Sequence, residues 1–428
     1  MTALPQEVVD DIINGIAQEE RALDLLLACS LVCRAFLPRS QKHIFHKLVI
    51  RSDEDNEKDS PGNKRRTQRI KLLLTILEER PQIAELVQHV HIQCALEMGS
   101  VLWLAKDKGL HNLMGTLRKT ENPFRTFETT NMQLLTSEGE LVFSRFWVPF
   151  IAPHVNTLII DAALLLPSAF IQSCRKLTDL FLIAVFLGPS AHIRLPYESL
   201  AMQPILLDRL DSCMSSNAVP ESLGWDKQNE QHKQHAIISV ESLRHYRIYT
   251  AIGRGELGDQ ISVFQCSGKT LKTLVLDKID PSVSDEAIKK ISLYDAPNLE
   301  SLALGFDYEV QTCVLFDDDE AQQVERREAS IRHASTVLAS SASSHLIQSL
   351  TLNATFLVRR DGRGLFPWSG QVPGLPFIML EAALLKFRSA AAKNCKIRIN
   401  IYCREIGGDI ILTLCKRAGV FFTYSVLG

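Results

Sequence analysis

The chain has 428 residues, of which 46% are hydrophobic and 22% charged, and its formal net charge is −2. This balance is typical of a globular protein with its own core, and it excludes binding to nucleic acid or to an anionic membrane through bulk positive charge. The ten cysteines are scattered without a Cys-x-x-Cys pair, which favours a reducing compartment. No apolar stretch approaches the roughly 18 residues of a membrane span, and the acidic start MTALPQEVVDDII is unlike a signal peptide. We therefore expect a soluble protein of the cytoplasm, the nucleus or both.

Residues 1–50 predict three short amphipathic helices. Pro5 suits the first turn of a helix, because the amide that it lacks would have no partner there. Apolar residues then recur at helical spacing in three runs: Val8, Val9, Ile12, Ile13 and Ile16; Leu23, Leu26, Leu27, Leu31, Val32 and Phe36; and Ile44, Phe45 and Leu48. Helices this short bury little apolar surface between themselves, so we expect a partner to cover the rest.

The same segment resembles the F-box motif. The matching stretches follow in order as Leu4-Pro5-x-Glu7-Val8, Ile12-Ile13, Asp24-Leu25-Leu26, Cys29-Ser-Leu-Val-Cys33-Arg34-x-Phe36 and Phe45-x-x-Leu48. The form CSLVCRxF looks especially like fungal members of that family. F-box modules dock on the Skp-type adaptor of a cullin-RING ubiquitin ligase, so the resemblance implies that adaptor and, through it, a cullin as partners.

Carried over residue by residue, the resemblance implies a docking surface and its immediate support. These positions are Leu4, Pro5, Val8, Ile12, Leu26, Val32, Cys33 and Phe36. An ordinary helical subdomain that packs on its own chain is the alternative.

Four potential zinc ligands also follow in order, as Cys29, Cys33, His43 and His46. Zinc sites of this type usually set their ligand pairs on a turn or hairpin and a helix. Both cysteines lie instead in an apolar helical run. We therefore reject this site, and we expect no metal and no cofactor.

Residues 51–68, RSDEDNEKDSPGNKRRTQ, contain no apolar residue. Such a stretch predicts a solvated linker or loop. The expected organisation is therefore an F-box over 1–50, a polar linker or loop over 51–68, and one α/β body over 69–428.

A short pattern recurs along this body, with apolar residues at its first, fourth and sixth positions. The copies are Val87-Val90-Ile92, Val155-Leu158-Ile160, Leu177-Leu180-Leu182, Leu243-Tyr246-Ile248, Leu271-Leu274-Leu276, Leu299-Leu302-Leu304, Ile347-Leu350-Leu352 and, in part, Ile397-Ile399. Helix-like segments such as DEAIKKISLY lie between them. Alternating strands and helices predict parallel strands joined by crossovers. On the strand that contains Val90 and Ile92, His89 and His91 would then share the face opposite the core.

The pattern resembles the Leu-x-x-Leu-x-Leu strand of leucine-rich repeats. Several intervals, such as Leu158 to Leu180 and Leu274 to Leu302, fit the period of ~20–29 residues of that family. The spacing is irregular elsewhere, with a long gap between Leu182 and Leu243, and the asparagine that follows the strand in regular repeats is absent. We therefore expect an α/β fold with an irregular, leucine-rich-repeat-like solenoid after the F-box. A non-repeat α/β domain is the alternative.

The clearest resemblance to a catalytic motif is Gly253-Arg-Gly255-Glu-Leu-Gly258, which follows a strand-like segment and precedes Asp277. A dinucleotide fold has that order, but the next strand follows too soon and a lone match is weak. We expect a turn between repeats and no nucleotide. The acidic run Asp317-Asp318-Asp319-Glu320 predicts the start of a helix rather than a cation site.

The sequence thus predicts a non-enzymatic substrate receptor of a ubiquitin ligase, with an unidentified protein as its substrate. One alternative is an interaction scaffold unconnected to ubiquitin transfer. Another is a nucleotide-dependent oxidoreductase that uses Gly253–Gly258.

Overall fold

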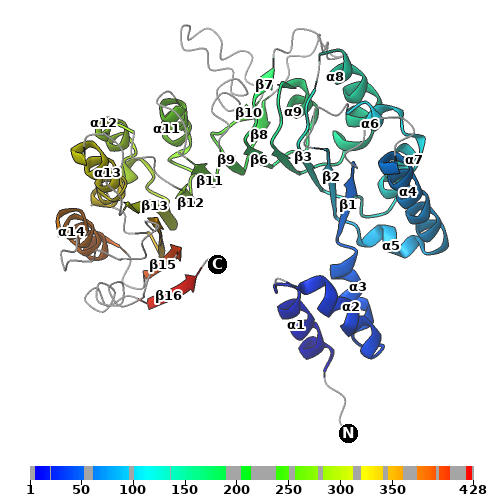
Figure 1. The fold of residues 1–428 in the computed structure, drawn as a ribbon, viewed down its shortest axis with the longest axis horizontal. Coiled ribbons are helices and arrows are strands. Elements are labelled where there is room, and N and C mark those ends of the chain that lie inside the picture. Colours follow the sequence, from blue (N-terminus) through cyan, green and yellow to red (C-terminus); the bar gives the residue numbers. More distant parts are fainter. Residues whose placement is uncertain are drawn as a thin grey trace. The chain divides into compact units, whose positions relative to one another are not determined.

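A computed structural model shows an α/β chain with extensive parallel pairing of its strands (Figure 1). It describes residues 5–19, 21–52, 61–95, 101–134, 136–188, 204–213, 238–249, 256–277, 283–311, 320–340, 346–359, 374–391, 395–404 and 421–426. The chain divides into two compact units, Met1–Ile205 and Leu206–Gly428.

The first unit begins with three helices, as the apolar spacing predicted. They are α1 (Gln6–Ile16), α2 (Ala22–Val32) and α3 (Leu37–Ile44). Val9, Ile13 and Leu26 are their buried apolar side chains. Arg39 of α3 donates hydrogen bonds of 2.8 and 2.6 Å to Oδ1 of Asn14 in α1. A small core and a polar clamp therefore hold this three-helix module together.

The strands of the first unit pair in the order β1-β2-β3-β4-β6, and every pairing is parallel. They are β1 (Lys47–Arg51), β2 (His89–Gln93), β3 (Thr126–Thr130), β4 (Thr157–Asp161) and β6 (Asp179–Ile183). The register aligns Leu48, Val90, Phe127, Leu158 and Leu180. The short strands β5 (Leu166–Pro167) and β7 (Leu187–Gly188) form a second parallel pair. Four members of this row are buried, namely Val90, Phe127, Leu158 and Leu180. This confirms that the recurrent apolar pattern marks neighbouring parallel strands.

The second unit repeats this arrangement in the order β9-β11-β12-β13-β14-β15-β16. The strands are β9 (Arg209–Cys213), β11 (His245–Tyr249), β12 (Thr273–Asp277), β13 (Ser301–Gln311), β14 (Ser349–Arg359), β15 (Lys396–Arg404) and β16 (Phe421–Val426). The register aligns Leu210, Tyr246, Leu274, Leu302, Leu350 and Ile397. The first five of these are buried. The short strands β8 (Ile205–Leu206) and β10 (Ile238–Ser239) pair with each other.

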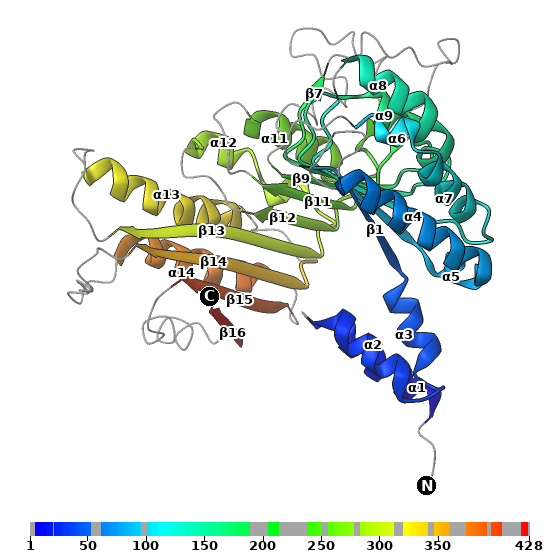
Figure 2. The same ribbon diagram turned by 45° about the vertical axis from the view of Figure 1, so that its right-hand side comes forward.

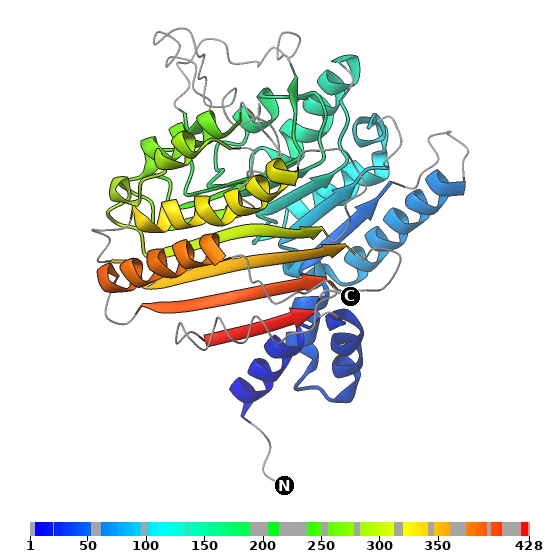
Figure 3. The ribbon, with the colours of Figure 1, turned by 60° about the vertical axis from the view of Figure 1, so that its left-hand side comes forward.

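In each unit the connecting helices lie on one face of the sheet (Figures 1 and 3). In the first unit these are α4 (Pro61–Glu79), α5 (Pro81–Leu86), α6 (Trp103–Lys106), α7 (Lys108–Arg118), α8 (Thr136–Val142), the π-helix η1 (Phe143–Ile151) and α9 (Ala169–Ser173). In the second they are α11 (Glu256–Ser267), α12 (Asp285–Lys289), the 3-10 turn η4 (Leu293–Asp295), α13 (Glu320–Ala339) and α14 (Gly374–Ala390). The opposite face carries none of these helices, and we call it the open face. Among the described helices, none combines the length and the apolar character that a bilayer-crossing segment requires.

Strands β3 and β9 are missing from the recurrent pattern, because a hydroxyl residue occupies the sixth position of each. In β3 the pattern reads Phe124-x-x-Phe127-x-Thr129, and in β9 it reads Leu207-x-x-Leu210-x-Ser212. All six side chains are buried. The strand β9 also lies in the long gap between Leu182 and Leu243.

The interval 51–68, expected as a linker or loop, is in part helical, because α4 begins at Pro61. Residues 53–60 lie outside the described ranges. The basic residue Arg66 is buried despite its charge. Its guanidinium carbon lies 4.3 Å from the centre of the Trp103 ring, and its Nε lies 3.7 Å from Oδ2 of Asp107. A cation–π contact and an ion pair therefore replace the apolar contacts that the sequence lacks here. The interval also starts within β1, so the first strand of the sheet crosses the boundary expected at residue 50.

Candidate functional site

The surface of α2 is apolar on nearly every side. Of its eleven residues only Leu26 is buried. Five large apolar side chains are exposed, which together we call the α2 surface: Leu23 (57%), Leu25 (44%), Leu27 (46%), Leu31 (87%) and Val32 (67%). At 100° per residue, Leu23, Leu27 and Leu31 form one stripe, and Leu25 and Val32 lie on another side. A helix that is apolar all round is normally buried, so this exposure indicates a missing partner.

The docking residues implied by the F-box resemblance fall into two groups around this helix. Pro5 at the N-cap of α1 and Val8 and Ile12 within α1 are exposed, and their three-and-four spacing places them on one stripe. After α2, Cys33 is exposed and Phe36 is half-buried. A hydrogen bond of 3.3 Å from the side chain of Gln6 to the carbonyl oxygen of Ala35 joins the two groups.

The remaining implied positions have different environments. Leu26 is 3% exposed and supports the module from inside. Val32 belongs to the α2 surface, and Leu4 lies outside the described residues. The docking positions implied by the resemblance do not include Leu23, Leu25, Leu27 or Leu31. The sequence does carry a signal for their exposure, because a short helix that is apolar on every side cannot bury all of its leucines in a small module.

Of the four potential zinc ligands, His43 contacts another side chain of the module. Nε2 of His43 lies 2.9 Å from Oδ1 of Asn14, within the clamp between α1 and α3. Burial lowers the pKa of His43, and the charge of Arg39 adds to this effect. Within the described ranges, no group of three or more His, Cys, Asp or Glu side chains has a metal-binding arrangement.

The open face of the first unit carries a polar cluster centred on Glu128 of β3. Oε2 of Glu128 lies 2.5 Å from Nζ of Lys47 and 2.9 Å from Nε2 of His89, and Oε1 lies 3.7 Å from Nε2 of His91. Nε2 of His91 also lies 2.9 Å from Oγ1 of Thr130. The strand register produces this grouping, because Lys47 is aligned with His89, and His91 with Glu128. The prediction that the two histidines share the face opposite the core is confirmed.

Burial lowers the pKa of His89 to about 4, and the charge of Lys47 acts in the same direction. Burial also lowers the pKa of His91. For Glu128 burial opposes ionisation, but the hydrogen bond from Lys47 and the nearby positive charges outweigh it and lower its pKa. Near pH 7 the cluster therefore presents a Lys47–Glu128 ion pair beside uncharged His89.

Replacing His89 with glutamine is expected to weaken the dependence of thermal stability on pH. His89 holds a proton less firmly in the folded chain than in the unfolded chain. Its effect on stability is therefore absent above about pH 6.5, and it destabilises the fold increasingly as the pH falls toward 4. Melting temperatures measured between about pH 5 and 7 should fall less for His89→Gln than for the unchanged chain. The exposed His46, changed to glutamine, is the control. Equal slopes for all three proteins would contradict this assignment.

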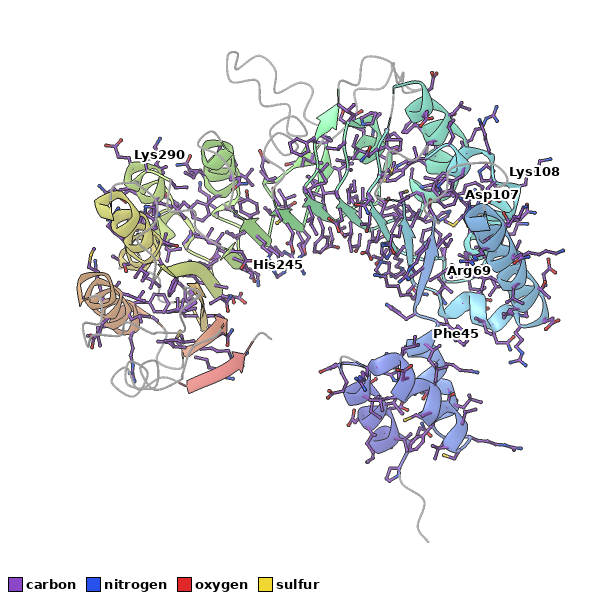
Figure 4. The ribbon with its side chains drawn as sticks, viewed as in Figure 1. Phe45, Arg69, Asp107, Lys108, His245 and Lys290 are labelled. Carbon is purple, nitrogen blue, oxygen red and sulfur yellow. The ribbon has the colours of Figure 1, made fainter. Side chains whose placement is uncertain are left out.

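The open face of the second unit carries paired polar side chains. Nε of Arg247 on β11 lies 2.5 Å from Oδ2 of Asp277 on β12. The amide of Asn400 donates a hydrogen bond of 2.9 Å to Oδ1 of Asn353. Figure 4 shows His245 on this side of β11, and Lys290, which follows α12, on the side of the helices. These pairs give the face hydrogen-bonding groups in fixed positions.

The glycine motif is only partly described. Gly253 and Gly255 lie outside the described residues, and Gly258 lies within α11. Asp277, the acid that a dinucleotide site would require, forms an ion pair with Arg247. Glu320 begins α13, as the acidic run predicted.

No protein-family model, no curated protein and no solved structure matches this chain.

Proposed function

We propose that the chain is the non-catalytic substrate-recognition subunit of an SCF-type ubiquitin ligase. The module α1–α3 is its F-box and binds a Skp-type adaptor, which connects the chain to a cullin. The parallel sheets and their helices form an irregular leucine-rich-repeat-like solenoid, which binds a protein target. The chain itself forms and breaks no covalent bond in this role.

The α2 surface is the observation that carries the proposal. Burying a leucine or valine side chain contributes about 1.5–3 kcal/mol, and here five such side chains are exposed on one eleven-residue helix. A soluble protein rarely leaves an apolar patch of this kind without a binding role. The F-box motif residues lie in the same module, and the family's partner for that module is the adaptor.

The repeated strands support the second part of the proposal. Positions four and six of the apolar pattern are aligned from strand to strand in each unit, and helices fill one face. In each unit this leaves the other face of the sheet without these helices (Figure 2), and the strand register aligns its side chains in rows. Rows of side chains on a rigid sheet suit recognition of a protein surface.

The direct test is complex formation between the intact chain and a purified Skp-type adaptor, measured by size-exclusion chromatography with light scattering. We expect a 1:1 complex that also retains a cullin when one is added. A chain that stays alone at micromolar concentrations would support the scaffold alternative. Melting temperature should not change with NAD(H), NADP(H) or FAD, since a ligand of the native state must raise it. A saturable rise would instead support the oxidoreductase alternative.

A further inference from the structure

Three large apolar side chains are exposed where β4 and β6 end. Leu164 and Leu165 follow β4 and are 43% and 49% exposed, and Phe186 follows β6 and is 45% exposed. The two turns are hydrogen-bonded to each other, because the amide of Phe186 donates to the carbonyl of Ala163 at 2.8 Å. We call Leu164, Leu165 and Phe186 the β4–β6 corner. None of the three belongs to the proposed adaptor-binding module.

The backbone at this corner has an unusual conformation. The carbonyl of Phe186 accepts a hydrogen bond of 3.1 Å from the amide of Leu166. Leu164 and Leu165 therefore both lie opposite Phe186, which is a β-bulge. Leu165 has a φ of 56°, in the left-handed region that a leucine rarely adopts. The chain thus keeps a leucine where its backbone is strained and its side chain is exposed, and strain of this kind is concentrated at functional sites.

One carboxylate lies beside the corner, on the open face of β4. Asp161 is the last residue of β4, three residues before Leu164, and it is aligned with Ile183 at the end of β6. Within the described part of the chain, Asp161 has no Lys or Arg within ion-pairing distance. Burial and the neighbouring Glu128 both raise the pKa of Asp161, so a cation beside it would be favourable.

We propose that the β4–β6 corner and Asp161 form a docking site for a target segment that combines aliphatic or aromatic side chains with a lysine or arginine. The apolar side chains of the segment cover Leu164, Leu165 and Phe186, and its cation pairs with Asp161. The composition of this segment follows from complementarity. The corner presents apolar surface, and the carboxylate of Asp161 beside it has no Lys or Arg partner among the described residues. The assignment of this segment to a ubiquitination target depends on the proposed function, but the docking chemistry does not.

The test uses randomised twelve-residue peptides displayed on phage and selected on the full-length chain. We expect the enriched peptides to contain Leu, Ile or Phe together with Lys or Arg. Their affinity, measured by fluorescence anisotropy with synthetic copies, should fall at least tenfold for Leu165→Gly and for Phe186→Ser. Asp161→Asn should weaken the peptides with a cation and leave versions with citrulline in its place unchanged.

The variant Leu165→Gly separates binding from folding. Glycine adopts a φ of 56° without strain, so this variant should melt no lower than the unchanged chain while it loses the peptide. A lower melting temperature would indicate a packing role and overturn the proposal. Enrichment of acidic peptides, no enrichment, or self-association that Leu165→Gly abolishes would also overturn it. Adaptor binding is measured on the same variants and should be unchanged, so a chain that binds peptide but no adaptor would refute only the proposed function.

Discussion

Replacing Leu302 with alanine is expected to lower the free energy of unfolding of the second unit by about 2–5 kcal/mol. Leu302 of β13 is fully buried, and its strand neighbours Leu274 and Leu350 are buried on either side. Truncation removes apolar contact and leaves a cavity that a close-packed sheet cannot fill by a small shift. The loss is comparable with a large part of the stability of an ordinary domain.

Hydrogen exchange of the β12, β13 and β14 amides measures this loss within the second unit alone. The control is Leu346→Ala, because this leucine belongs to the same unit and is 51% exposed. We expect less than about 0.5 kcal/mol for the control. Similar exchange rates for the two variants would mean that Leu302 does not lie in the core.

The positions of most strands in the large sheet could be predicted, because the alternation of apolar and polar side chains is a property of each short segment by itself. A strand that is packed by helices on one face must place apolar side chains at alternate positions, and Leu274 and Leu276 follow this rule. Strands β3 and β9 could not be found with the apolar pattern, because Thr129 and Ser212 occupy its sixth position. These small hydroxyl side chains are buried as well. Residues 1–50 predicted three helices for the same local reason.

The helix α4 could not be predicted from apolar spacing at its start. Arg66 is accommodated by Trp103 on α6 and by Asp107, which lies between α6 and α7. Contacts of this kind depend on the tertiary fold, so a charged stretch that appears solvated in the sequence can be partly buried.

The functional sites also differ in how far the sequence alone could predict them. The α2 surface could have been recognised from a run that is apolar on every side. The cluster around Glu128 required the register of three strands, because Lys47, His89 and Glu128 are far apart in the sequence. The left-handed backbone of Leu165 has no signal in the sequence, since that conformation is normally reserved for glycine or asparagine.

Changing Leu31 to glutamine and Val32 to threonine is expected to weaken adaptor binding by about 2 kcal/mol or more for each anchor. Interfaces concentrate their energy in a few side chains that become fully buried, and these two are the most exposed of the α2 surface. Both replacements are close in size to the original residues but carry polar groups, which would lose their water on binding without a guaranteed partner. Phe36→Ala and the pair Leu4→Ala with Pro5→Ala should weaken binding similarly, because the resemblance assigns these residues to the docking surface.

Isothermal titration of the full-length chain with a purified Skp-type adaptor measures the effect, and a loss of 2 kcal/mol corresponds to about thirtyfold in the dissociation constant. Leu72→Gln on α4 is the matched control, because this leucine is 63% exposed but lies outside the three-helix module. It should leave the affinity unchanged. The double variant should also keep its far-ultraviolet circular dichroism and melting temperature, because neither side chain contributes to the core. If the double variant and Leu72→Gln bind the adaptor as tightly as the unchanged chain, the α2 surface is not the docking site, and its exposed leucines require a different partner.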